Sequence, residues 1–302
     1  MNKTISKLWK NPLLLMVSLG HRGYFNWMSD RTYLRMVFFI KMGRWLNLYN
    51  PKTFNEKLQW IKLNDRNPEY TRMVDKFEAK KYVADRIGGD YIIPTIGVWN
   101  NAKDIDFNSL PNKFVLKCTH DSGGLVICKD KSKIDIEATV HKLNGCLKHN
   151  FFWAMREWPY KDVKPRIIAE QYMEDESGEL RDYKFFCFDG EVKALFIATD
   201  RNNPKEETKF DFFDAEFNHL PFTNGHPNAQ VLPQKPKCFE EMKQLASKLS
   251  LGITQVRVDF YEIKGRVYFG EMTFFHWSGL TPFVPEKWDY EFGSWIDLKT
   301  QQ

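Results

Sequence analysis

The chain has 302 residues, of which 43% are hydrophobic and 27% are charged, and its formal net charge is +5. This composition excludes a wholly disordered chain, and so mild a charge gives no indication of a nucleic-acid partner. The length suits one large domain or two lobes around a cleft. The five cysteines form no C-x-x-C pair, which argues against a disulfide framework or a structural zinc site and indicates a reducing, cytoplasmic compartment.

Residues 1–52, up to the boundary at Asn50-Pro51, form a basic segment. Its first 50 residues hold eight lysines or arginines and a single acid, Asp30. The apolar run at 13–19 is far shorter than the roughly 20 residues that span a bilayer, and no small-residue cleavage site follows it. We therefore expect a short helix there.

Residues 31–46 predict a basic amphipathic helix. Its apolar positions at helical spacing are Leu34, Val37, Phe38, Met42 and Trp45. We favour docking of this helix on the main body, since amphipathic helices usually pack on protein. The alternative is that it lies on an anionic membrane surface, which would make the protein peripheral at the inner face of the membrane.

The middle of the chain mixes helices and strands. Thr53 and Glu56 form a capping-box pattern at the start of a helix over 53–66, with Phe54, Leu58 and Ile61 on one side. A second helical pattern covers 70–87 and ends at Gly88-Gly89. Strands are predicted at 113–119, 125–128 and 167–173, and a helix at 135–150.

The second half is rich in strands. Asp189-Gly190 indicates a tight hairpin between 183–188 and 191–198, and another hairpin covers 254–274. Residues 200–236 are polar with aromatic interruptions, and we expect a functional loop or irregular structure there. A helix is predicted at 236–250, with its inward face formed by Phe239, Met242, Leu245, Ala246 and Leu249. Together the elements predict an α+β fold with mostly antiparallel strands.

A lysine and a glycine-rich turn form the first candidate site. Lys117 lies on a predicted strand and points away from Phe114, and the sequence His120-Asp121-Ser122-Gly123-Gly124 follows it. Backbone N–H groups of such a turn can approach an anion. Taken alone, this pattern is more often a flexible hairpin turn.

The last hairpin is the second candidate site. Arg257 and Asp259 share one face of its first strand, and Glu271 lies on the returning strand. Mg²⁺ prefers carboxylate oxygens, so a metal site requires both acids on one face. A two-residue loop at Lys264-Gly265 would pair Asp259 with Gly270. We therefore predict a three-residue loop over 264–266, which pairs Asp259 with Glu271 and Arg257 with Thr273.

The order of these motifs resembles the ATP-grasp superfamily. It runs from Lys76 through the strand lysine with Ser-Gly-Gly and the strand 169–173 to Arg-x-Asp and Gly-Glu-x-Thr. Residues 54–60, 182–185 and 269–274 resemble the TupA-like branch, which is linked to teichuronopeptide and other surface-polysaccharide biosynthesis. The resemblance covers about residues 53–297.

The resemblance implies two α+β lobes, 53–173 and 174–297, that enclose a cleft for ATP and Mg²⁺. Lys76 and Lys117 would hold the phosphates, and Arg257 would stabilise the transferring phosphoryl group. Lys184 would contact a phosphate or the acceptor. The loop that closes over the phosphates would consist of Ser122, Gly123 and Gly124. The hinge that offers backbone groups to adenine would consist of Glu170, Gln171, Tyr172 and Met173. The metal ligands would be Asp259, Glu271 and Thr273, and Thr273 stands where many relatives have an asparagine.

The implied activity is that of a carboxylate–amine ligase, which forms an amide through an acyl phosphate in the biosynthesis of capsule or another surface polysaccharide. The acid would be a uronic acid or an amino acid. A glycosyltransferase is an alternative, since Asp104-Ile105-Asp106 offers a D-x-D pattern, although we favour a turn there. A noncatalytic membrane-associated assembly factor is another.

Two histidines and one loop remain as candidates for the acceptor site. His120 and His276 could bind the acceptor or donate a proton. Asp200 and Arg201 begin the long loop and could shape the acceptor pocket.

Overall fold

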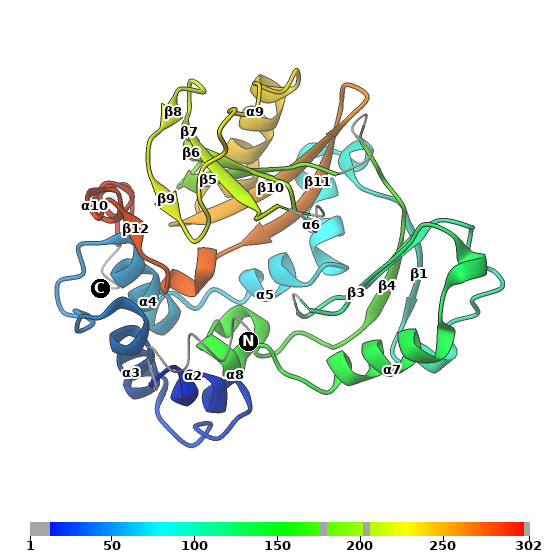
Figure 1. Cartoon of the computed structure of the whole chain (residues 1–302), viewed down its shortest axis with the longest axis horizontal. Coiled ribbons are helices and arrows are strands. Elements are labelled where there is room, and N and C mark those ends of the chain that lie inside the picture. The colour runs from blue at the N-terminus through cyan, green and yellow to red at the C-terminus, as the bar shows by residue number, and fades with distance from the viewer. Residues whose placement is uncertain (1–12, 122, 176–179, 202–205, 299–302) are drawn as a thin grey trace.

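The computed structural model describes residues 13–121, 123–175, 180–201 and 206–298, so Ser122 lies outside the described residues. Two antiparallel sheets form the frame (Figure 1). The four-stranded sheet has the order β1 (Thr95–Trp99), β4 (Ile167–Gln171), β2 (Phe114–Cys118) and β3 (Leu125–Cys128). The six-stranded sheet has the order β11 (Arg266–Thr273), β10 (Val256–Ile263), β5 (Asp182–Phe188), β6 (Glu191–Thr199), β7 (Lys209–Asp214) and β8 (His219–Leu220). The predicted α+β class and antiparallel pairing are confirmed.

The four-stranded sheet has its own core on one face. Phe114, Leu116 and Cys118 point into it and pack with Leu143 of helix α7 (Ile136–Leu147). Val115 and Lys117 alternate with them on the other face, as the period of two requires. That face is turned toward the larger sheet, so Lys117 lies between the two sheets.

The six-stranded sheet carries the main core. The inward residues predicted for 236–250 are all buried in helix α9 (Phe239–Ser250). Its core also includes residues of α4 (Phe54–Asn64), α5 (Glu69–Val74), α6 (Glu78–Ile87) and α10 (Lys287–Ser294). A small sheet of β9 (Thr223–Asn224) and β12 (Phe283–Val284) lies beside them. Residues 54–87 therefore pack on the larger sheet.

The helix predicted over 70–87 and the loop predicted over 200–236 both differ from the structure. The helix predicted over 70–87 is two helices, because the Asp75 carboxylate accepts hydrogen bonds from the N–H of Phe77 at 2.8 Å and of Glu78 at 3.4 Å and so caps a new helix. The loop predicted over 200–236 contains β7, which pairs with β6 along its whole length. There Phe210, Phe212 and Phe213 are all buried, so their apolar surface joins the core.

The basic segment packs on the body. Leu34, Val37 and Phe38 of α3 (Asp30–Met42) are fully buried, in a cluster that also includes residues of α2 (Leu14–His21). Buried Arg156, just after α8 (Phe152–Met155), lies 3.2 Å from Asp30. Trp45, which we expected on the apolar face, is instead 73% exposed. Within the described residues, no helix is long and apolar enough to cross a bilayer.

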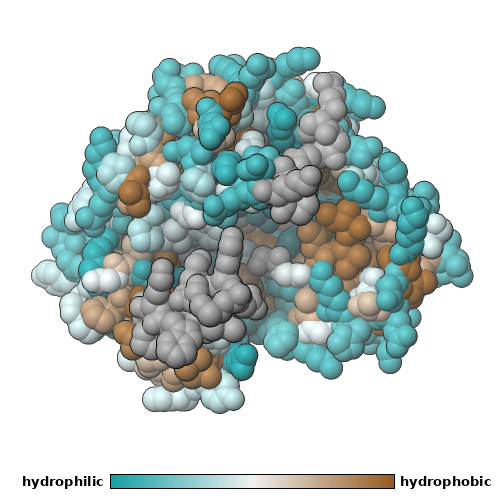
Figure 2. Space-filling model, in the orientation of Figure 1, coloured by the Kyte–Doolittle hydropathy of each residue, from teal (hydrophilic) through white to brown (hydrophobic). Residues whose placement is uncertain are grey.

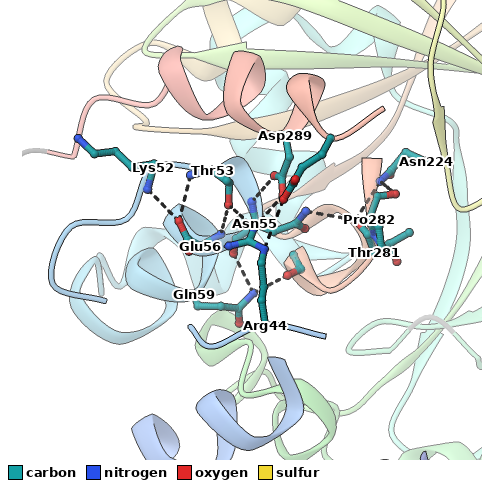
Figure 3. Close-up of polar contacts among 12 residues, drawn as sticks. Arg44, Lys52, Thr53, Asn55, Glu56, Gln59, Asn224, Thr281, Pro282 and Asp289 are labelled. Carbon is teal, nitrogen blue, oxygen red and sulfur yellow. Dashed lines mark hydrogen bonds and ion pairs between the residues drawn. The ribbon is translucent and has the colours of Figure 1, made fainter. Parts of the chain in front are cut away.

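Side chains of helix α4 form hydrogen bonds with the backbone of the segment that follows β11 (Figure 3). The predicted capping box of Thr53 and Glu56 is present. Gln59 Nε2 donates to the carbonyls of Ser278 and Gly279, each at 2.9 Å. Asn55 donates its side-chain amide to the carbonyl of Thr281 at 3.2 Å. The polar side of this helix is therefore buried as well, and it fixes the backbone over 278–281.

We predict that Gly293→Ala destabilises the fold by about 1–3 kcal/mol through overpacking. A Cβ at Gly293 would lie 2.7 Å from the N of Phe54 and 2.8 Å from the C of Thr53, and backbone atoms cannot give way. The control is Gly145→Ala in α7, where no atom lies within 4 Å; it should be neutral or stabilise by up to about 1 kcal/mol. Urea unfolding of both variants measures this, and equal stabilities would contradict the packing of α10 on α4.

Candidate functional site

Two adjoining cavities of about 250 and 200 Å³ lie between the sheets. The first is lined by Lys76, Lys80, Lys117 and Lys184 together with Glu170, Asp182 and Glu271. The second is more apolar and is lined by Val115, Leu125, Ile127, Tyr172, Met173 and Leu180, among others. Figure 2 shows this face hollowed there, with hydrophobic surface beside the hollow. The two cavities together suit a ligand with an anionic end and a flat, less polar end.

Glu170 holds two of the lysines in the wall of the cleft. Its carboxylate lies 2.6 Å from Lys117 Nζ and 2.5 Å from Lys80 Nζ. Burial opposes ionisation of Glu170, but the two ammonium groups outweigh burial and hold its pKa below the ordinary value. Glu170 is therefore a carboxylate that neutralises part of the positive charge of the site.

Lys76 lies at the break between α5 and α6. Its N–H donates to the carbonyl of Thr119 at 3.1 Å, and its ammonium group contacts the carbonyl of Asp121. Arg166 binds the Asp75 carboxylate at 2.7 Å and so fixes the break from the other side. The interruption of the predicted helix thus carries Lys76 to the glycine-rich turn. Burial lowers the pKa of Lys76, although nearby Glu271 and Asp121 oppose this.

The glycine-rich turn is seated on β2. Gly124 N–H donates to Asp121 Oδ1 at 3.0 Å, and its carbonyl accepts from Cys118 N–H at 2.7 Å. A Cβ at Gly124 would lie 2.5 Å from Cys118 Sγ, so only glycine fits. Ligand atoms of Cys118, Asp121 and Cys146 lie within 4.8 Å of one another although the sequence has no zinc spacing. Burial, reinforced by Asp121, raises the pKa of Cys118 to about 12 and keeps it a thiol.

The predicted pairing in the last hairpin is confirmed, but the predicted three-residue loop is wrong. Asp259 pairs with Glu271 and Arg257 pairs with Thr273. The loop has two residues, Lys264 and Gly265, both with positive φ, and Ile263 pairs with Arg266. The register instead shifts at a β-bulge between Asp259 and Phe260, where Gly270 is the extra residue. The bulge brings both acids to one face.

Asp259 is the centre of a buried ion cluster. Arg257 binds it through two hydrogen bonds, Nε to Oδ1 at 2.7 Å and Nη2 to Oδ2 at 2.8 Å, and Lys184 contacts Oδ2. Arg257 Nη2 also donates to Glu271 at 3.1 Å and to the Thr273 hydroxyl at 3.0 Å. A fully buried carboxylate needs such partners, because an unpaired charge is costly in the interior.

Glu271 faces the cleft and is strongly acidic. Burial would raise its pKa, but Lys184, Arg257 and Lys76 outweigh burial and lower the pKa to about 2. Asp259, Glu271 and Thr273 together offer two carboxylates and a hydroxyl, the hard oxygen donors that Mg²⁺ prefers. Asp259 Oδ1 accepts a hydrogen bond from Arg257, and Oδ2 accepts from both Arg257 and Lys184, so an ion at Oδ2 would compete with Lys184 for that oxygen.

The cleft also holds residues that sequence reasoning missed. Lys80 of α6 lies within the helical pattern over 70–87 but was not singled out, and it lines the first cavity. Asp182 is two residues from Lys184 on β5 and so shares its face; that spacing could have indicated it. Asp182 contacts Arg201 and lies 3.3 Å from Lys184. Tyr261 of β10 lines both cavities.

A third cavity of about 470 Å³ meets the first at Lys76, Asp121 and Glu271, which line both. Arg257 and Thr273 also line it, and aromatic side chains of Phe151, Tyr160, Phe275 and Trp277 form much of its wall. The ion cluster therefore has access to space on two sides.

His276 is buried, and both of its ring nitrogens have hydrogen-bond partners. Its Nδ1 lies 3.0 Å from Arg257 Nη1, and its Nε2 lies 3.0 Å from Asn224 Oδ1. Burial, together with the charges of Arg257 and Lys184, lowers its pKa well below the ordinary value. The neutral ring therefore positions Arg257.

Two other sequence candidates lie away from the cleft. His120 is buried, with Nε2 3.2 Å from the carbonyl of Cys146 and 3.1 Å from that of His149, so it packs beneath the turn. Asp104 ends a short 3₁₀ helix, and Asp106 accepts from Asn108 N–H at 3.0 Å. Both acids are exposed, and neither lines any of the three cavities. The turn favoured for the D-x-D sequence is what the structure contains.

We predict that Glu170→Gln destabilises the free protein by about 1–3 kcal/mol at pH 7, because two ammonium groups lose their counter-charge. The folded-state pKa of Glu170 lies below its unfolded value. The Glu170 carboxylate therefore stabilises the folded state fully above the unfolded pKa, and this stabilisation is lost as pH falls through the folded pKa. The gap between wild type and variant should therefore narrow below about pH 4.5. The control is Glu174→Gln, because the ion pair of Glu174 with Lys113 is exposed. Urea unfolding at pH 7 and pH 4 measures the free energy of unfolding of both variants. A difference between wild type and Glu170→Gln that does not change with pH would contradict this electrostatic account.

Several solved structures are similar to this chain at low sequence identity. No protein of curated function matches the chain. It is similar to the D-alanine–D-alanine ligase of Bacillus anthracis complexed with ATP, at 16% identity over 67% of this chain and 53% of that chain, with a TM-score of 0.37. It is also similar to the D-alanine–D-alanine ligase of Helicobacter pylori, at 15% identity over 82% and 68% of the two chains, with a TM-score of 0.43. The D-cycloserine synthetase DcsG matches at 16% identity over 76% and 70%, also with a TM-score of 0.43.

The chain spans about half the length of the first of these ligases. Residues 56–297 of the chain match the family described as TupA-like ATPgrasp. This range takes in α4, both sheets and the ion cluster of β10 and β11. The chain belongs to the TupA-like ATP-grasp family.

Proposed function

We propose that this protein is an ATP- and Mg²⁺-dependent carboxylate–amine ligase that forms an amide through an acyl phosphate. The observation that carries the proposal is a cleft with an apolar end, in which four lysines and Glu271 lie beside the ion cluster of Arg257 and Asp259. Catalysis of phosphoryl transfer depends on positioning and on offsetting charge, and this set of side chains supplies both.

In this proposal the triphosphate binds beside Lys76 and Lys117, under the turn of Ser122, Gly123 and Gly124. Before the nucleotide arrives, Glu170 keeps Lys117 and Lys80 in place as their counter-ion. The adenine then lies in the more apolar cavity, against Tyr172 and Met173, which line it with Gln171. The backbone after Glu170 supplies the hydrogen bonds for the base.

Mg²⁺ would be held by Asp259, Glu271 and Thr273, and when bound it would offset negative charge on the phosphates. Lys184 leaves the Asp259 carboxylate for a phosphate oxygen in this scheme. Arg257 keeps its two hydrogen bonds to Asp259 and directs Nη2 toward Glu271. The chain thus exchanges one counter-charge for another and leaves no buried carboxylate unpaired.

The proposed reaction has two steps. A carboxylate oxygen of the acid attacks the γ-phosphorus of ATP. The bond between the γ-phosphorus and the bridging oxygen breaks, ADP departs, and the acid becomes an acyl phosphate. An amine then attacks the acyl carbon and phosphate departs, giving the amide, inorganic phosphate and a proton. The acid would be a uronic acid or an amino acid that enters from the third cavity, and the amide would serve capsule or other cell-surface polysaccharide biosynthesis.

We predict that the wild type releases ADP only when an acid and an amine are both present, and that Lys117→Ala or Glu271→Gln lowers kcat by about 10²–10³-fold. The control is Lys133→Ala, an exposed position that lines none of the three cavities. Mg-ATP should also raise the melting temperature, whereas an Mg-UDP-sugar should not. Full activity in either site variant contradicts the proposal, and stabilisation by the UDP-sugar alone would favour the glycosyltransferase alternative.

We also propose that the basic segment rests on an anionic membrane surface, at the inner face of the membrane. Its helix α3 uses its buried face for the body, but four aromatic residues near it are exposed: Tyr24 at 64%, Trp27 at 81%, Trp45 at 73% and Tyr49 at 100%. Exposed aromatics among arginines and lysines are typical of helices that lie in the interface of anionic lipid.

We predict that the full chain co-sediments with vesicles containing phosphatidylserine, and that added salt weakens this binding. Trp27→Ala combined with Trp45→Ala should reduce the bound fraction several-fold, since both rings would insert at the interface. Tyr290→Ala, also exposed but outside the segment, is the control. Equal sedimentation of the double variant and the wild type would argue against membrane contact by this surface.

A further inference from the structure

Two cysteines and an aspartate form a cluster of metal-ligating side chains at the glycine-rich turn. Cys118 is the last residue of β2, Asp121 lies in the turn, and Cys146 belongs to helix α7. One ligand atom of each residue lies within 4.8 Å of the other two. Because the two cysteines come from different elements, their spacing in the sequence resembles no zinc motif, and it is the fold that brings them together.

The donor atoms and their spacing suit a cation that prefers sulfur. Zinc bonds thiolate sulfur at about 2.3 Å and carboxylate oxygen at about 2.0–2.2 Å, so the ligand atoms of a tetrahedral site lie about 3.5–3.8 Å apart. The three ligand atoms of this cluster are all within 4.8 Å of one another. Modest rotations of the cysteine side chains would therefore place all three atoms on one ion, with water in the fourth position.

Neighbouring groups hold the three ligand residues in position. Asp121 Oδ1 accepts a hydrogen bond from the Gly124 N–H at 3.0 Å, and the Cys118 N–H donates to the Gly124 carbonyl at 2.7 Å. His120 Nε2 lies 3.2 Å from the carbonyl of Cys146, which ties the helix to the turn. Metal ligands in proteins are commonly oriented by hydrogen bonds of this kind. The backbone that carries the cluster is therefore already in place before an ion binds.

The first cavity gives an ion access to the cluster. Cys118, Asp121 and Gly124 line that cavity beside Lys76. Asp121 and Cys146 are half-buried, whereas Cys118 is 1% exposed and packs with the core of the smaller sheet. An ion that enters from the cleft would therefore be held at the edge of this core, largely shielded from bulk water. A metal site needs such an entry path in addition to its ligands.

The charges around the cluster decide which cations can bind. Burial, followed by the negative charge of Asp121, raises the pKa of both Cys118 and Cys146, so the free protein holds two neutral thiols. Lys76 and Lys142 act in the opposite direction, but each of these ammonium groups also contacts a backbone carbonyl. A cation must therefore displace two protons. Thiophilic ions do this, because a thiol that coordinates such an ion loses its proton.

We infer that Cys118, Asp121 and Cys146 bind one thiophilic divalent cation, of which Zn²⁺ is the type. The two thiol protons pass to water as the two sulfur–metal bonds form. Mg²⁺ prefers oxygen ligands, so this site is separate from the one proposed at Asp259 and Glu271. The bound ion would join β2, the glycine-rich turn and α7, and so would fix the turn against the smaller sheet. This inference needs no nucleotide and does not rest on the proposed ligase activity.

The test titrates the full chain with Co²⁺, which substitutes for Zn²⁺ and is visible in absorption spectra. A phosphine reductant keeps the cysteines as thiols during the titration. A cobalt ion bonded to thiolate sulfur gives a charge-transfer band in the near ultraviolet, whereas an ion held by the oxygens of Asp259 and Glu271 gives none. The band of the wild type should saturate at about one equivalent of Co²⁺. Added Zn²⁺ should then abolish the band, because it binds such sites more tightly than Co²⁺ does.

Variants of the ligand residues identify the site. Cys146→Ala should lose the band, and its affinity for Zn²⁺ in calorimetry should be at least about tenfold weaker than that of the wild type. Asp121→Asn should weaken Zn²⁺ binding as well but keep a thiolate band. The control is Cys238→Ser, because Cys238 is also half-buried but lies outside the cluster, and it should behave as the wild type.

Urea unfolding without metal checks that the variants fold as the wild type does, and Cys146→Ser, whose side chain is closer in size and polarity, is tested beside Cys146→Ala. The absence of a thiolate band in the wild type overturns the inference. A band that persists in both Cys146 variants, or one that Cys238→Ser removes, also overturns it. Binding of Zn²⁺ at wild-type strength by Asp121→Asn would overturn the three-ligand site.

Discussion

The Asp259 carboxylate lies fully buried in the six-stranded sheet, where Arg257 binds both of its oxygens and Lys184 contacts one. A charge in that position is tolerable only while its partners stay in place, and removal of one partner from such a group is costly. The bulge at Gly270 then sets Glu271 opposite Asp259 and within reach of the same guanidinium. Every other part of the site is arranged around this cluster of opposite charges.

The rest of the cleft follows the same electrostatic logic. Glu170 neutralises Lys117 and Lys80 on the smaller sheet, and the carbonyl of Asp121 holds Lys76 at the break between α5 and α6. In the proposed function these internal counter-ions stand where a nucleotide's phosphates would later supply the negative charge. Because these cations are already in position, little energy is needed to rearrange them when an anion binds. Helix α4 plays the corresponding role on the other side, because its buried polar residues fix the backbone after β11.

Local chemistry made some of this predictable. The capping box of Thr53 and Glu56, the Asp189-Gly190 hairpin and the inward face of α9 depend on neighbours in sequence, and the structure has all three. The pairing of Asp259 with Glu271 was predicted correctly from the requirement that both acids share one face. The predicted cause, a three-residue turn, was wrong, because a β-bulge at Gly270 produces this pairing instead. The break at Asp75 has a local cause, the carboxylate that caps the next helix, but the role of Lys80 depends on Glu170 of another element. Contacts between distant segments of this kind leave no periodic signal in the sequence.

The most direct measurement of the central claim is a calorimetric titration of the full chain with ATP, in excess Mg²⁺ and again in a chelator. The account predicts that Mg²⁺ tightens ATP binding to the wild type, and that in Glu271→Gln most of this tightening is lost while ATP still binds through the lysines. ATP affinity that is the same with and without Mg²⁺ in the wild type, or no ATP binding at all, would contradict the assignment of the Asp259–Glu271 pair to a nucleotide-linked ion.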